Sequence, residues 1–224
     1  KVAKNILRSN GMILSTGPTG SGKSTSLFSI LGMVSLPGVN VVTLEDPVEY
    51  HIPGVNQVQI RPDIGFTFAT GLRSILRQDP NVVMVGEIRD SETAELAVHA
   101  SLTGHLVLST LHTNDAPSAI PRLIDMGIEP FLISSSLVLV MAQRLTRKIC
   151  DHCRTELDIP ENKKEEIVAY LQNVPKEHLE KIGIDLQNIK FYRGLGCSYC
   201  HNSGYKGRIG VFEVLEISDA LHDL

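Results

Sequence analysis

The residues with the clearest chemistry form a glycine-rich segment from Gly17 to Ser24, with the spacing G-x-x-x-x-G-K-S. Its glycines let the backbone turn sharply and bring N–H groups against phosphate oxygens. Lys23 supplies a point charge for the β- and γ-phosphates, and the Ser24 hydroxyl can coordinate Mg²⁺. The segment therefore predicts a P-loop. Its candidate phosphate-binding residues are Gly17, Pro18, Thr19, Gly20, Ser21, Gly22, Lys23 and Ser24.

The sequence on either side of this segment fits a P-loop. Met12–Ser15 is an apolar run long enough for a buried strand, and Ser24–Met33 repeats apolar residues at helical spacing. The order of strand, glycine loop and helix aims a helix N-terminus at an anion. The alternative is a glycine-rich turn that matches the motif by chance, and it does not account for this order.

Further strands and helices alternate along the chain. The patterns predict strands at 39–44, 82–85 and 106–109, and helices at 66–78 and 91–102. Strands separated by helices indicate an α/β fold with a mainly parallel sheet covered on both faces. In such sheets ligands bind at the carboxyl ends of the strands, and the polar motifs of this chain follow strands.

Acidic side chains follow two of the predicted strands. Glu45 and Asp46 come directly after the second strand, and Pro47 disfavours helix at Asp46. The third strand ends in Glu87, which is the arrangement of a Walker B motif that orients Mg²⁺-bound or attacking water. Gly86 stands where many P-loop enzymes carry Asp, so the sequence assigns that work to Glu87. For Glu45 and Asp46 the alternative is a solvated acidic turn.

Two histidines flank the fourth predicted strand. His112 follows the strand and could sense the γ-phosphate, whereas His105 precedes the strand and would lie further away. A lone histidine is more often structural, so both interpretations stay open for His112.

These motifs together carry a family resemblance. The stretches GPTGSGKST, LEDPVEY, LRQDPNVVMVGEIRD and TGHLVLSTLHTN occur in this order. They resemble the Walker A, Asp box, Walker B and His box of the bacterial secretion ATPase superfamily. More narrowly, they resemble the type II secretion and type IV pilus-assembly ATPases (the GspE/PilB type), from Lys1 to about Glu216. The resemblance implies a RecA-like core that uses ATP and Mg²⁺, phosphate binding at Gly20 to Thr25, catalytic carboxylates at Glu45 and Glu87, and a His-box role for His112.

Four cysteines are arranged as two C-x-x-C pairs, Cys150 with Cys153 and Cys197 with Cys200. Paired knuckles of this kind bind Zn²⁺ tetrahedrally in structural sites. The spacer of 43 residues (154–196) is longer than in usual zinc ribbons, and its Lys- and Glu-rich stretch 160–182 predicts helical turns. Disulfides are disfavoured because an ATP-using protein without a signal sequence sits in reducing cytosol.

We therefore predict a small tetracysteine zinc-binding module beside the P-loop core. His152 and His201 lie near the knuckles in the sequence. We interpret both as residues that do not bind the metal, or that only contact its ligands, because four cysteines complete the tetrahedral shell of a Zn²⁺ ion. The flanking sequences LTRKIC and GCSYCHNSGYKGRIGVFE resemble the tetracysteine module of secretion and pilus-extension ATPases. Pilus-retraction ATPases generally lack that module, so the resemblance points to a polymerising motor.

Three arginines are candidates for subunit interfaces. Arg73 and Arg77 are four residues apart and would share one face of a continuous helix, and Arg89 follows Glu87 closely. In ring ATPases an arginine from one subunit completes the site of the next. The alternative for each arginine is solvated charge, or pairing within the chain with Asp79 or Asp90.

Composition argues against several other classes. The chain has 224 residues, 42% of them hydrophobic, with a net charge of −4, 5% aromatics and no Trp. An acidic chain with few aromatics argues against direct nucleic-acid binding as its main task. The longest apolar candidate, Phe131–Ala142, is interrupted by serines and is too short to span a bilayer. The alternatives that remain are a nucleic-acid-dependent motor on a RecA-like core and a non-hydrolysing nucleotide-binding scaffold.

The expected organisation is a P-loop core at 1–146, a zinc module at 147–208 and a return segment at 209–224. Both termini look cut, so we expect a piece of a longer protein. The resemblance implies that the longer protein is a cytoplasmic homo-hexamer, peripheral at the inner membrane. It would bind there to a membrane platform protein and its adaptor.

Overall fold

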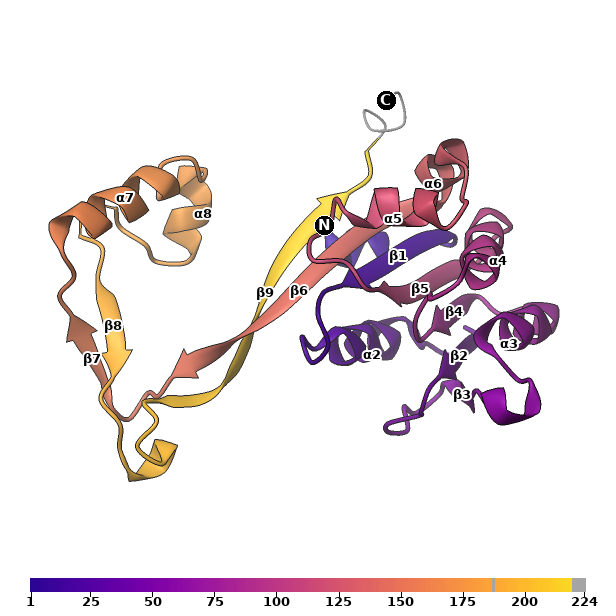
Figure 1. Ribbon diagram of the computed structural model, residues 1–224, viewed down its shortest axis with the longest axis horizontal. Helices are drawn as coiled ribbons and strands as arrows, with labels where there is room; N and C mark the ends of the chain where they lie inside the picture. Colours follow the sequence, from indigo (N-terminus) through magenta and orange to yellow (C-terminus); the bar gives the residue numbers. More distant parts are fainter. Residues whose placement is uncertain (187, 219–224) are drawn as a thin grey trace. The chain divides into compact units, whose positions relative to one another are not determined.

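The computed structural model describes residues 1–186 and 188–218, and it contains a seven-stranded sheet in the order β3-β2-β4-β5-β1-β6-β9 (Figure 1). The pairs β1–β5, β1–β6, β2–β3, β2–β4 and β4–β5 are all parallel, which confirms the predicted α/β fold with a mainly parallel sheet. The strands are β1 Gly11–Thr16, β2 Val41–Glu45, β3 Asn56–Gln59, β4 Val82–Val85, β5 Leu106–Leu111, β6 Leu137–Ile149 and β9 Tyr205–Glu216.

Helices cover the two faces of this sheet unequally. Along a strand, alternate side chains point to opposite faces. The face that carries Ile13 and Leu108 packs against α2 (Lys23–Val34) and against Ile6, the residue after α1 (Val2–Asn5). The other face, which carries Leu14 and Val107, packs against four helices. These are α3 Phe68–Ile75, α4 Ser91–Leu102, α5 Ala119–Asp125 and α6 Pro130–Ser136.

Element boundaries differ from the sequence patterns at several points. The helix expected over 66–78 begins at Phe68, after the cap residue Thr67, and gives way to a 3₁₀ turn at Leu76–Gln78. That turn ends at Asp79, whose φ of 50° is left-handed, and Pro80 cannot continue a helix. A further 3₁₀ turn, Pro62–Ile64, follows β3.

The sequence patterns did not predict β3, α5, α6 or β6. β3 is a short strand of mostly polar residues, NQVQ, with none of the hydrophobic periodicity that marks a strand. The apolar run 131–142 splits between a helix that ends at Ser136 and a strand that begins at Leu137. The hydrophobic periodicity of the sequence does not by itself distinguish a helix from a strand in such short apolar runs.

The chain divides into two compact units. One is Lys1–Leu145 together with the segment from Gly210, and it holds the P-loop; the other is Thr146–Ile209. The second unit contains the antiparallel pair β7 Arg154–Leu157 and β8 Phe191–Gly194, with a 3₁₀ turn at Ser198–Cys200. The helical turns predicted over 160–182 are α7 Glu161–Leu171 and α8 Lys176–Lys181. Within the described residues, none of the helices combines the length and apolar character that a membrane crossing requires.

Candidate nucleotide and metal sites

The predicted P-loop joins β1 to α2 through three glycines with left-handed backbone. Gly17, Gly20 and Gly22 have φ values of 133°, 75° and 90°, and Gly22 is the N-cap residue of α2. Side chains rarely adopt these angles, which explains the glycines at these points. The loop therefore presents successive backbone N–H groups at the start of a helix, where an anion binds well.

Lys23 is the first residue of α2 and is 9% exposed. Its Nζ donates hydrogen bonds to the carbonyl oxygens of Gly17, at 2.9 Å, and Pro18, at 3.0 Å. Burial lowers the pKa of Lys23, and the charge of Glu87 opposes this shift. The ammonium group therefore folds back onto the loop, and it lies within electrostatic reach of the Glu87 carboxylate.

The hydroxyl groups of the loop differ in burial. Ser24 and Thr25, like Pro18 and Thr19, are exposed, so the Ser24 hydroxyl is accessible to a cation. Ser21 is 4% exposed, and within the described part of the chain its buried Oγ has no hydrogen-bond partner. An unpartnered hydroxyl and several turning N–H groups fit a polyphosphate ligand, which offers acceptor oxygens.

Glu45 ends β2 and is 3% exposed. Its Oε1 accepts hydrogen bonds from Thr43 Oγ1 at 2.5 Å and from Gln57 Nε2 at 2.9 Å. A buried carboxylate needs such donors, so one oxygen of Glu45 is held while no hydrogen bond of the described residues reaches Oε2. The neighbouring Asp46, by contrast, is exposed.

Glu87 lies in the turn between β4 and α4, and its side chain is 14% exposed. Its Oε1 pairs with Arg89 at 2.6 Å, and its Oε2 lies 3.3 Å from His112 Nε2. Buried Ile88 points the other way, and its N–H donates to Thr110 O at 3.0 Å. The turn is thereby fixed with Glu87 and Arg89 on the same side.

Gly86, where many P-loop enzymes have Asp, has little free space beside it. A Cβ at this position would lie 3.1 Å from Leu44 O and 3.5 Å from the Phe68 ring. A side chain could enter only if this packing shifted, so the carboxylate at this strand end is that of Glu87.

The two histidines differ as their positions along the sequence suggest. His112 is half exposed beside Glu87, at the carboxyl end of β5. His105 precedes β5, and its Nδ1 lies 3.0 Å from Ala100 O, at the opposite end of that strand. The structure therefore brings His112, and not His105, to Glu87.

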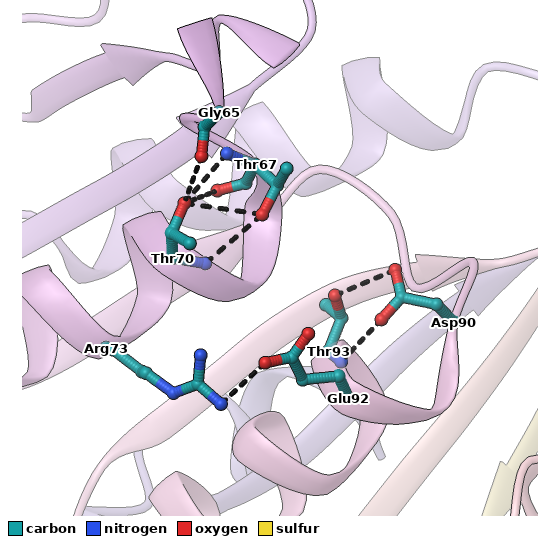
Figure 2. A network of polar contacts seen from close by, with 7 residues as sticks. All are labelled: Gly65, Thr67, Thr70, Arg73, Asp90, Glu92 and Thr93. Atoms are coloured by element: carbon teal, nitrogen blue, oxygen red, sulfur yellow. Dashed lines mark hydrogen bonds and ion pairs between the residues drawn. The ribbon is translucent and has the colours of Figure 1, made fainter.

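The arginines have partners that the sequence did not indicate. Arg73 pairs with Glu92 at 2.5 Å (Figure 2), and Arg89 pairs with Glu87. Both arginines are thus paired within the chain, with glutamates as partners rather than Asp79 or Asp90. Arg77 is exposed and lies in the 3₁₀ turn after α3, so a continuous helix does not place it beside Arg73. Their roles at a subunit interface stay a prediction.

Figure 2 shows how the starts of α3 and α4 are fixed. Thr67 and Thr70 form a capping box at the start of α3. Asp90 caps α4: its Oδ1 accepts from Thr93 N at 2.8 Å, and its Oδ2 accepts from Thr93 Oγ1 at 3.1 Å. α4 begins at Ser91, as the sequence predicts. Its cap residue is Asp90, whose carboxylate also suits the positive end of the helix dipole.

The four cysteines form one cluster in the second unit. Cys150, Cys153, Cys197 and Cys200 are free thiols whose Sγ atoms all lie within 4.8 Å of one another. Three of the Sγ pairs are 3.7, 3.8 and 3.9 Å apart. A tetrahedral zinc site with Zn–S bonds of about 2.3 Å places its sulfurs about 3.8 Å from one another. The cluster therefore fits one Zn²⁺.

Backbone N–H groups also point at these sulfurs. Gly196 N–H donates to Cys153 Sγ at 3.3 Å, and Cys200 Sγ accepts from Cys197 at 3.2 Å and Gly204 at 3.3 Å. Such donors orient the ligands of a metal site and stabilise thiolates. His152 stacks on Tyr199, with ring centroids 4.1 Å apart, and belongs to no metal-ligating cluster of the described residues.

Three residues at the P-loop and the Asp box carry no motif that sequence inspection could recognise. Thr43 and Gln57 hold Glu45, and Gln143 of β6 lies against the P-loop. Thr43 is two residues from Glu45 in the same strand, which is a weak local signal. Gln57 and Gln143 are distant in sequence, and only the sheet order brings them to the site.

Comparisons with known proteins agree with this geometry. The family model described as "Type II/IV secretion system protein" matches residues 1–224. The chain is 49% identical over 219 residues to "Type IV pilus assembly ATPase PilB" of Thermus thermophilus, covering 96% of this chain and 23% of that protein. It is 51% identical over 219 residues to "Type II secretion system ATPase E" of Vibrio cholerae, covering 98% of this chain and 41% of that protein. The chain thus spans less than half the length of these relatives.

Solved structures share the fold. The pilus retraction motor PilT with bound ADP is similar with a TM-score of 0.62 and 37% identity, covering 83% of this chain and 62% of that one. The ATPase DotB of Legionella pneumophila has a TM-score of 0.65 at 24% identity, covering 99% of this chain and 49% of that one, and supports the fold alone.

Proposed function

The chain belongs to the type II/IV secretion system protein family, and we propose that it is the ATP-hydrolysing motor domain of a hexameric ATPase. The motor would power assembly of a pilus or of a type II secretion pseudopilus, and the domain boundaries predicted above are part of this proposal. The observation that carries it is the convergence of three groups at the carboxyl ends of β1, β4 and β5: the P-loop with Lys23, the carboxylate of Glu87, and His112.

The residues of the P-loop would hold the nucleotide. ATP offers phosphate oxygens that replace the carbonyls of Gly17 and Pro18 as partners of the Lys23 ammonium group. The turning N–H groups at Gly20 to Thr25 would bind the same oxygens, and Ser24 would coordinate Mg²⁺. Mg²⁺ held there would supply positive charge that offsets the negative charge developing on the phosphates.

Glu87 would position and deprotonate the attacking water. Its two oxygens are held by Arg89 and His112, so its orientation is fixed while the carboxylate remains 14% exposed. His112 would report the state of the γ-phosphate through its contact with Glu87. Glu45, held on one oxygen, would supply a second acidic group beside Mg²⁺.

Cys150, Cys153, Cys197 and Cys200 would hold one Zn²⁺ with a structural role, since four thiolates leave no open position for a substrate. The proposal for the longer protein follows from the family. It would form a homo-hexamer in the cytoplasm and associate peripherally with the inner membrane through a platform protein and its adaptor. Arg73, Arg77 and Arg89 are the candidates for contacts between its subunits, and no nucleic acid takes part.

The test is ATP hydrolysis by the full-length protein and its Lys23→Ala variant. We expect the variant to lose hydrolysis, because the γ-phosphate loses its fixed cation. Lys163→Ala, an exposed lysine of α7, is the matched control and should hydrolyse at the wild-type rate. Wild-type turnover by Lys23→Ala would contradict the P-loop assignment. A wild-type protein that binds ATP without hydrolysing it would indicate a nucleotide-binding scaffold, and turnover that required DNA or RNA would indicate a nucleic-acid motor.

A further inference from the structure

Gln143 lies against the P-loop although it belongs to no nucleotide-binding motif. It is a residue of β6, and it is 4% exposed. β6 pairs with β1 in parallel, with Thr16 opposite Ala142, so the next residues along the two strands are Gly17 and Gln143. The strand that borders β1 therefore continues beside the loop where that loop begins.

Three parts of Gln143 contact or face the loop and the helix after it. Its Oε1 accepts a hydrogen bond from Ser26 Oγ at 2.7 Å, in the first turn of α2. Its backbone oxygen lies 2.4 Å from the point where a Cβ of Gly17 would stand. Its Nε2 lies 2.8 Å from the corresponding point of Gly22. Gln143 thus reaches both ends of the glycine loop and the helix that follows.

These distances give two of the glycines a second physical reason. The left-handed backbone at Gly17 and Gly22 already disfavours a side chain. The space a side chain would need is also filled, by the main chain of Gln143 at Gly17 and by its amide at Gly22. The loop is therefore contacted by Gln143 of β6 at both Gly17 and Gly22.

We propose that Gln143 is a positioning residue that holds the P-loop and the first turn of α2 in the geometry that binds the nucleotide phosphates. The inference rests on the proposed function. A buried amide hydrogen-bonded to a helix hydroxyl fixes α2 relative to β6. The loop is anchored at β1 and at α2, so fixing α2 also fixes the direction of the loop N–H groups and of Lys23. Because ADP and ATP share the phosphates that the loop contacts, Gln143 should contribute to the binding of both.

The experiment compares Gln143→Met, Ser26→Ala and the double variant in the full-length protein. Met keeps the approximate volume of Gln and removes the acceptor and the amide. Ser26→Ala removes the donor from a half-buried helix position, where Ala favours helix. The matched control is Ser29→Ala, one turn further along α2, whose hydroxyl bonds within the helix to Thr25 O. Measurements are the dissociation constants of ADP and ATP, KM and kcat.

We expect each single variant to weaken ADP and ATP binding by about five- to tenfold, which is the scale of one lost hydrogen bond. KM should rise in parallel, while kcat at saturation stays within about threefold of the wild-type value. The lost contact would stabilise the bound substrate and the transition state equally, so its removal weakens binding without slowing the chemical step. In the double variant the loss should be no greater than in Gln143→Met alone, since the two side chains act as one contact. Ser29→Ala should behave as wild type.

Several outcomes would overturn the inference. Nucleotide affinity within twofold of wild type in Ser26→Ala would do so, and that variant tests the contact even if Gln143→Met does not fold. Losses that simply add in the double variant would also do so. A fall in kcat with unchanged affinity would indicate a smaller folded fraction rather than loop positioning. In all these cases wild-type hydrolysis persists, whereas failure of the proposed function would appear as no hydrolysis by the wild type.

Discussion

The two units of this chain bury apolar surface to very different extents. In the P-loop unit, helices cover both faces of the sheet, and side chains such as Leu14 and Leu108 are fully buried. In Thr146–Ile209 the buried residues among those described are Cys150, Leu179, Cys200 and Gly204. Two of these four belong to the cysteine cluster, so the second unit has almost no apolar core.

This difference indicates two ways of stabilising a fold. A sheet packed on both faces is stabilised by apolar burial, so its strand ends can carry polar residues such as Glu87 and Lys23 that serve chemistry rather than stability. A unit of this small size rarely builds enough core of its own, and a structural metal then supplies the missing stability. The comparison therefore separates residues whose loss affects chemistry from residues whose loss affects folding.

The largest expected effect is the unfolding of the second unit when the proposed zinc is removed. Structural zinc contributes about 10 kcal/mol or more of apparent binding free energy in small zinc domains, and the proposed ion would stabilise Thr146–Ile209 in the same way. Cys197→Ser, or chelation, should raise hydrogen exchange throughout that unit and leave exchange in β1, β4 and β5 unchanged. Metal analysis should find one zinc per chain in the wild type.

The control for this experiment is Ser198→Ala, an exposed neighbour of the cluster, which should retain both metal and protection. Less than about half an equivalent of zinc in the purified wild type, with four titratable thiols and no other metal, would contradict the zinc assignment. Loss of protection in β1 after chelation would contradict the separation of the two units.

The second-largest expected effect is a loss of ATP hydrolysis that leaves the P-loop unit folded. Glu87→Gln keeps the shape of the side chain and removes the charge that would orient and deprotonate water. Turnover of the full-length protein should fall by about 10² or more, the scale of losing a positioned base, while ATP binding survives. Measured kcat and ATP affinity decide the outcome, with Glu95→Gln on the exposed face of α4 as the control. Loss of ATP binding would instead make Glu87 a structural residue.

The smallest effect concerns a polar contact that holds the site turn in place. Asp90 caps α4 through two hydrogen bonds to Thr93 (Figure 2). Asp90→Ala should lower the free energy of unfolding of the P-loop unit by about 1 kcal/mol, measured as a shift of its urea midpoint. Ser91→Ala should change it by less than about 0.5 kcal/mol, because the exposed Ser91 side chain is not the cap. Equal effects from the two substitutions would refute this assignment of the cap.

The sequence by itself determined the local chemistry of this protein. Gly17 to Ser24, Glu87 and the four cysteines are recognisable because their spacing along the chain is the property that their chemistry requires. The buried strands β1, β4 and β5 were predictable for a similar reason, since apolar runs bounded by turn residues are local signals. The ends of α3 were less predictable, because the cap residue Thr67 and the 3₁₀ turn before Asp79 decided them through side-chain hydrogen bonds and backbone geometry. The bounds of α4, by contrast, match the predicted range.

Only the tertiary structure decided which residues surround these motifs. Arg89 and His112 meet on Glu87, Gln57 reaches Glu45 from β3, and Gln143 supports the P-loop from β6. No periodic pattern in the sequence predicts these contacts, because each depends on which strands lie side by side in the sheet. In a parallel sheet every neighbour is reached through a crossover, so strand order follows from packing of the whole chain rather than from adjacency in sequence. The motifs could therefore be recognised in the sequence, whereas the residues that position them can be identified only in the tertiary structure.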